Sequence, residues 1–264
     1  MPTGTVASSG RMPALGFVVM LDDAKRMRGE VREQVCIIFV VAMFLLRPNT
    51  AQGFRSGDVY IDVRRHIVII FVRHCKRWPE LRHSPAQREI CCGAPGTPSG
   101  VVFDLFAAAA REDEEWYTRL ARSASPTTGA AVLTAWVQAR CDARRVPRPA
   151  GRHFTGYSVR IAVASTMWAY RMDERWIQAW GYWRTQDQYM AYVRKTFGRH
   201  PFLAGLVSFG FDLQDGRAFD FSTRRSAPPA DARSEGLSAR LQQLRPADRD
   251  DCSRRDRRGG LLLL

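Results

Sequence analysis

The sequence lacks the patterns of a secreted, disulfide-rich or zinc-binding protein. Its six cysteines are scattered over 264 residues with no Cys-x-x-Cys pair. No signal-like segment opens the chain, so a secreted disulfide framework is not expected. Cysteines and histidines crowd the stretch from His66 to Cys92, but their spacing does not match paired zinc ligands. We therefore expect a protein of a reducing compartment that uses no metal and no cofactor.

The sequence also lacks an apolar run long enough to cross a membrane. Its strongest run, Val35–Leu46, has 12 residues and is bounded by the charged residues Glu33 and Arg47. A membrane helix needs about 20 apolar residues. The run therefore predicts a buried core helix, and no membrane partner is expected.

Acidic residues are few compared with basic ones. The chain has 26 Asp and Glu against 40 Lys and Arg, a formal charge of +14. Such a charge favours a polyanionic partner, because Lys and Arg neutralise phosphates and release their counterions. Nucleic acid is the leading candidate, although codon usage alone can also enrich a chain in arginine. The charge by itself does not identify a function.

The two ends of the chain differ in composition from its middle. Residues 1–13 show no apolar periodicity, and residues 222–264 are rich in Ser, Pro, Ala, Asp and Arg with few large apolar side chains. Both segments are expected to be disordered, the second as a basic tail. One folded domain is expected over 14–221.

Within this domain, apolar periodicity predicts mostly helices and a few strands. The β-branched runs at 59–63 and 67–72 predict a hairpin, and a third short run at 90–92 would complete a small antiparallel sheet. Helical spacing is found at 17–46, 101–109, 113–122, 128–143, 158–170, 173–181 and 186–196. We expect an α+β fold, mainly helical with a small antiparallel β-sheet.

Three segments in the second half carry an ordered set of polar and aromatic residues. Arg160 follows Tyr157 by three residues, Trp183 follows Arg160 by 23, and Tyr192 follows Trp183 by nine. Singly, each fits a packed core. Together, the segments FTGYSVRIAVAS and WIQAWGYW and the later tyrosine resemble the C-terminal motifs of the tyrosine recombinases, the phage-type integrases. That family has a His-x-x-Arg box, then a His or Trp after a Gly, then a nucleophilic Tyr.

The first half extends this resemblance. The segment FLLRPNTA is similar to the family's box with its first catalytic arginine, which would be Arg47. The segment His74-Cys75-Lys76 falls where the strands turn and resembles the family's lysine turn. The resemblance covers about 47–197 and implies six catalytic residues: Arg47, Lys76, Tyr157, Arg160, Trp183 and Tyr192.

The resemblance also implies a mechanism. The two arginines would bind the non-bridging oxygens of a DNA phosphate, and Trp183 would support them through its indole N–H. Tyr192 would attack the phosphorus to form a 3′-phosphotyrosyl intermediate, while Lys76 would protonate the leaving 5′-oxygen. The partner would be double-stranded DNA in the nucleus or nucleoid, with a tetramer exchanging the strands of a mobile element.

The sequence departs from the family at several positions. Tyr157 replaces the usual His, Thr50 replaces an acidic residue, and Arg77 replaces a small hydroxyl residue. Only 46 residues precede Arg47, too few for the family's separate DNA-clamping domain. Two alternatives to an active enzyme therefore stay open. One is a truncated, catalytically impaired relic that only binds DNA, and the other is a basic RNA-associated or assembly protein.

Overall fold

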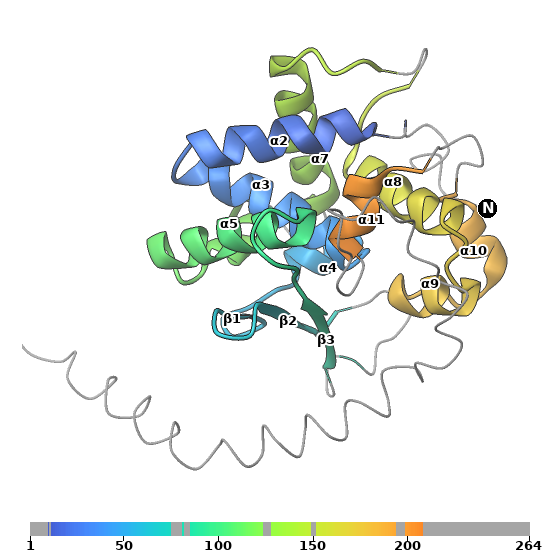
Figure 1. Ribbon diagram of the computed structural model, residues 1–264, viewed down its shortest axis with the longest axis horizontal. Coiled ribbons are helices and arrows are strands. Elements are labelled where there is room, and N and C mark those ends of the chain that lie inside the picture. Colours follow the sequence, from blue (N-terminus) through green and yellow to red (C-terminus); the bar gives the residue numbers. More distant parts are fainter. Residues whose placement is uncertain are drawn as a thin grey trace, which may run out of the picture. The chain divides into compact units, whose positions relative to one another are not determined.

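The computed structural model describes residues 10, 12–74, 81, 85–123, 128–148, 152–193 and 199–207. All of them belong to one compact unit within Met1–Phe219. They form a mainly helical body with a small antiparallel sheet at one side (Figure 1). The predicted fold class is confirmed. The predicted basic tail at 222–264 and the candidate residue Lys76 lie outside the described residues.

Apart from α4 and α11, the described helices follow the predicted order with shifted ends. They are α2 (Ala14–Arg26), α3 (Glu30–Met43), α4 (Pro48–Gln52), α5 (Pro98–Glu112), the 3₁₀ turn η2 (Trp116–Thr118), α6 (Arg119–Ser123), α7 (Gly129–Ala143), α8 (Gly156–Ala169), α9 (Glu174–Trp180), α10 (Gln186–Met190) and α11 (Pro201–Val207).

Helix α3 forms the centre of the core. Every residue from Val35 to Met43 is buried, and the helix contacts α2, α5 and α8. A helix that is apolar on all sides must be covered on all sides. This explains why α3 lies between other helices. The prediction of a buried core helix is confirmed. Among the described residues, no helix is long and apolar enough to span a membrane.

The sheet has the strand order β1 (Val59–Asp62), β2 (Ile67–Val72), β3 (Ala86–Cys91), with both pairs antiparallel. Val68, Ile70 and Val72 on one face of β2 are buried, and Ile69 on the other face is buried as well. The predicted hairpin is confirmed. The third strand begins at Ala86, earlier than the apolar run at 90–92 indicated.

The structure differs from the sequence prediction in further respects. Helix α10 ends at Met190, so Tyr192 lies in the turn after it and not on the helix expected over 186–196. Helices α4 and α11 were not predicted. Met12 is fully buried beside Cys141, which places it with the folded body and not with the disordered segment expected over 1–13.

Candidate active site

Arg160 is the centre of the candidate site. It lies in α8, which begins with a capping box formed by Thr155 and Ser158. Its side chain is 1% exposed, and a buried charge requires compensating contacts. One guanidinium nitrogen, Nη2, donates a hydrogen bond to the Gly181 carbonyl. The guanidinium carbon lies 4.1 Å from the ring centroid of Trp183.

Trp183 is positioned by the turn that ends α9. The backbone N–H of Trp183 donates to the Gln178 carbonyl at 2.9 Å, and the backbone N–H of Tyr182 donates to the Ala179 carbonyl at 3.2 Å. These two bonds define a Schellman motif with Tyr182 at the left-handed position, φ 53°. Glycine is usual there, and another residue costs about 1–2 kcal/mol. The turn is therefore held by contacts made elsewhere.

The indole of Trp183 carries an unsatisfied polar group. The side chain is 4% exposed, and its buried Nε1 has no hydrogen-bond partner among the described residues. Leaving a buried donor unpaired costs about 1–3 kcal/mol. A donor of this kind beside the Arg160 guanidinium is suited to an anionic oxygen brought by a ligand.

Tyr192 lies beside Trp183 and also packs against Arg160. The guanidinium carbon of Arg160 lies 5.0 Å from its ring centroid, and the Trp183 ring lies 5.1 Å away, centroid to centroid. The Tyr192 carbonyl accepts a 3.3 Å hydrogen bond from the Ser165 hydroxyl of α8. This bond anchors the turn after α10 to the helix that carries Arg160.

Tyr189 is the other candidate nucleophile near this turn. It is 0% exposed, whereas Tyr192 is 8% exposed. Burial and the nearby Glu174 raise the pKa of Tyr189 well above its ordinary value. A fully buried phenol that resists ionisation is a poorer nucleophile than one at the surface of the cluster. Of the two phenols, Tyr189 is the more deeply buried.

Tyr157 lies in the first turn of α8, half-buried, with its ring 6.4 Å from that of Tyr192. Burial raises the pKa of Tyr157, the Tyr192 phenol raises it further, and the charges of Arg47 and Arg160 lower it. The net shift is upward, so the phenol is neutral at physiological pH and acts as a hydrogen-bond donor.

Arg47 reaches this cluster from the first half of the chain. It is the half-buried N-cap of α4, and its charge acts on the Tyr157 phenol. The two helices approach closely, because a Cβ at Gly156 would lie 3.0 Å from Cγ of Pro48. Packing thus brings together residues that are about 110 positions apart in the chain.

The described part of the site therefore unites Arg47, Tyr157, Arg160, Trp183 and Tyr192. The sixth predicted residue, Lys76, falls outside the described residues. Just before it, His74 lies against α4, with its Cβ 3.2 Å from the position of a Cβ built at Gly53. In the described ranges, no group of three His, Cys, Asp or Glu side chains could hold a metal ion.

The cluster is closed in the arrangement described. The Arg160 guanidinium packs against two neighbouring aromatic rings and is almost fully buried. A phosphate can reach it only if side chains that bury it move. Once uncovered, the cluster offers cationic forks, an indole N–H and two phenols, a set suited to a phosphodiester.

The sequence did not indicate the side chains that support this cluster. Trp180 of α9 donates from Nε1 to the Met43 carbonyl at 3.0 Å and stacks on Phe44 with centroids 5.9 Å apart. These contacts fix α9 to the end of α3, next to the Arg47 segment. Arg88 of β3 also reaches α9. In the sequence, the aromatic-rich segment WIQAWGYW was the one indication of these supporting contacts.

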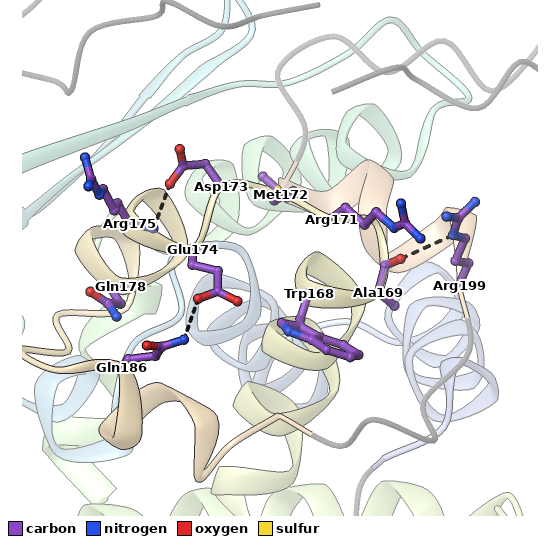
Figure 2. Close-up of a pocket in the computed structure, with 10 residues that line it drawn as sticks. All are labelled: Trp168, Ala169, Arg171, Met172, Asp173, Glu174, Arg175, Gln178, Gln186 and Arg199. Carbon is purple, nitrogen blue, oxygen red and sulfur yellow. Dashed lines mark hydrogen bonds between the residues drawn. The ribbon is translucent and has the colours of Figure 1, made fainter. Parts of the chain in front are cut away.

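A separate cavity of about 960 Å³ lies at the opposite, C-terminal end of α8 (Figure 2). Its charges are mixed: Arg199 donates to the Ala169 carbonyl at 3.2 Å, and Gln186 donates to Glu174 at 2.7 Å. The cavity contains none of the predicted catalytic residues. It is lined by Trp168, Ala169, Arg171, Met172, Asp173, Glu174, Arg175, Gln178, Gln186 and Arg199.

Comparison with known proteins gives a likeness in structure and none in sequence. No protein-family model matches the chain, and no curated protein matches it in sequence. A crystal structure of the XerH site-specific recombinase, bound to a palindromic difH substrate in a post-cleavage complex, is similar over 70% of this chain with a TM-score of 0.47 and 12% identity. The chain spans about half of that protein, 49% of its length. The likeness concerns the path of the backbone, and few residues are identical.

Proposed function

We propose that this protein cleaves and rejoins DNA strands through a 3′-phosphotyrosyl intermediate, as a site-specific recombinase or integrase of the tyrosine type. One observation carries the proposal. Residues chosen for their order in the sequence converge around Arg160, although they come from α4, α8 and the turns after α9 and α10. A chance match of sequence spacing would not require them to meet in space.

The proposed binding step uses the cationic and N–H groups of the cluster. Arg160 and Arg47 bind the non-bridging oxygens of the scissile phosphate, because a guanidinium fork matches two oxygens at once. The unpaired indole N–H of Trp183 donates to a third position on the phosphate. Tyr157, held neutral by burial, donates a hydrogen bond where the family has a histidine. These groups stabilise the charge that grows in the transition state.

In the proposed chemical step, Tyr192 is the nucleophile. Its Oη gives its proton to water and forms a bond to phosphorus as the bond from phosphorus to the 5′-oxygen breaks, and Lys76 gives a proton to that oxygen. The phosphodiester becomes a phosphotyrosyl ester of similar energy. The 5′-hydroxyl of a second strand reverses the step, so rejoining needs no nucleotide hydrolysis.

Cleavage on this scheme requires the cluster to open first. Tyr192 is one of the two rings packed against the Arg160 guanidinium, and its movement toward the phosphorus would expose part of the guanidinium to the phosphate. The same movement that frees Arg160 therefore delivers the nucleophile. Double-stranded DNA is the proposed partner, a tetramer the proposed assembly, and the nucleus or nucleoid the proposed location.

The decisive test is covalent capture on DNA. The full chain is incubated with a pool of nicked duplexes whose sequence is randomised around the nick, so that cleavage releases a short fragment and traps the adduct. We expect a protein–DNA adduct that Tyr192→Phe abolishes and Tyr189→Phe preserves. If Tyr189→Phe abolishes the adduct and Tyr192→Phe does not, the nucleophile is misassigned. Absence of any adduct from the unmodified protein refutes the cleavage proposal.

A second candidate function is DNA binding without cleavage. The closed, 1% exposed Arg160 favours it, as do Thr50 and Tyr157 at positions where the family has an acidic residue and a histidine. This protein would bind duplex DNA with an affinity that falls about a thousandfold between 50 and 200 mM salt, if six or more phosphates are contacted. Such binding, together with no adduct, would establish the alternative.

A further inference from the structure

We propose that Arg88 is a positioning residue that ties the β-sheet to the Trp183 turn and so holds the indole over Arg160. Its place in the reaction rests on the proposed function, whereas its effect on Trp183 does not. Arg88 lies in the middle of β3, opposite Ile70 of β2. In Figure 1, β3 is the strand that lies toward α9.

The described side-chain contacts of Arg88 fall on the last turn of α9 and the turn that follows it. Its Nη2 donates to the Ala179 carbonyl at 2.7 Å, and its Nε donates to the Tyr182 hydroxyl at 3.1 Å. Its guanidinium carbon also lies 4.5 Å from the Tyr182 ring centroid and 4.9 Å from that of Trp180. A cation at a helix C-terminus is favoured by the helix dipole. The Arg88 side chain thus contacts Ala179, Trp180 and Tyr182.

This turn is the one that needs support. Tyr182 holds a left-handed conformation that side chains other than glycine disfavour, and Trp183 follows it directly. Arg160 of α8 binds the same turn through the Gly181 carbonyl and the Trp183 ring. The turn is therefore clamped between an arginine from the sheet and an arginine from α8.

The clamp connects the two parts of the proposed site. Strands β2 and β3 flank the segment that contains Lys76, and β3 carries Arg88 to the turn that presents Trp183. Without Arg88, Tyr182 loses both a hydrogen bond and a cation over its ring, and the indole is free to shift. A misplacement of about 1 Å is enough to cost a reaction about a hundredfold.

The experiment compares Arg88→Ala with Arg64→Ala in the full chain. Arg64 is exposed in the turn between β1 and β2, so its loss removes the same charge without touching α9. Both proteins are labelled with 5-fluorotryptophan, and the Trp183 resonance is assigned with Trp183→Phe. We expect this resonance to shift or broaden in Arg88→Ala and to keep its position in Arg64→Ala. The Trp183 resonance is used and not that of Trp180, because Trp180 contacts Arg88 directly and its resonance would change with the loss of that contact alone.

Single-turnover cleavage of the nicked duplex pool adds a kinetic readout. We expect Arg88→Ala to cleave about ten- to a hundredfold more slowly than Arg64→Ala, with DNA affinities within about twofold of each other. Arg88→Lys should recover part of the rate, since it keeps one charged donor to the helix end. A merely structural surface arginine would not separate rate from affinity in this way.

The outcomes for Arg88 and for the enzyme are distinguishable. If the unmodified protein forms no adduct, cleavage is refuted and the fluorine resonance alone decides on Arg88. If Arg88→Ala does not fold, Tyr182→Phe removes only the hydroxyl that accepts from Nε, and it should still shift the Trp183 resonance. A Trp183 resonance that coincides with the unmodified protein in the folded Arg88 and Tyr182 variants overturns the proposal.

Discussion

Gly181→Ala is a direct test of how closely the Trp183 indole packs in the site. Gly181 is the C-cap of α9 with φ −88° and ψ 4°, a conformation that alanine adopts readily. At such a position, replacing glycine alone would stabilise the fold by about 0.4–1 kcal/mol, because the unfolded chain loses freedom. Any destabilisation must therefore come from contacts of the new methyl group.

Those contacts are severe. A Cβ at Gly181 would overlap Cζ3 and Cε3 of the Trp183 ring and lie 2.6 Å from its Cη2, where carbon atoms prefer about 3.5–4.0 Å. The ring must therefore move, which disturbs its stacking on the Arg160 guanidinium. Overpacking costs about 1–3 kcal/mol, and a desolvated cation–π contact contributes up to about 2 kcal/mol. We expect Gly181→Ala to lower the free energy of unfolding by about 2–4 kcal/mol.

The assay is a double-mutant cycle followed by urea and thermal unfolding. Gly181→Ala should lower Tm by roughly 5–15 °C in a domain of this size. In a Trp183→Ala background the ring is absent, so the same alanine should be neutral or slightly stabilising. The reasoning is refuted if Gly181→Ala alone leaves stability unchanged, or if its cost is the same with and without the indole.

Three further predictions concern the site and its surroundings. Tyr157→His should speed single-turnover cleavage about ten- to a hundredfold at pH 8, and this gain should disappear below about pH 6.5 as the imidazole gains a proton; an equal rate would mean that the phenol already suffices. Tyr192→Ala should uncover Arg160 and tighten binding to duplex DNA about three- to tenfold by removing an aromatic cover of up to about 2 kcal/mol, whereas Tyr192→Phe keeps the ring and should bind as the unmodified protein does. Burial raises the pKa of the Cys141 thiol to about 12, so at pH 8.5 iodoacetamide should modify it at least about a hundredfold more slowly than the exposed Cys91, as peptide mass mapping would show.

The sequence alone determined the local features of this protein. The apolar run at Val35 and the residues after it dictated a buried helix, and the β-branched runs around the turn at Arg64 dictated a hairpin. Both follow from local periodicity and burial, which a one-dimensional pattern records directly. The spacing from Tyr157 to Tyr192 also marked the candidate residues before any distance was known. Arg160 among apolar neighbours already required a buried partner for its charge.

Only the tertiary structure decided what surrounds those residues. It supplied the Gly181 carbonyl and the two aromatic rings as the partners of Arg160. It also placed Tyr192 in a turn beyond its helix and brought Arg88 to a turn about 90 positions further along the chain. Contacts of this kind depend on how helices and strands pack side by side. A sequence period fixes which face of an element is buried, but not which distant side chain meets it there.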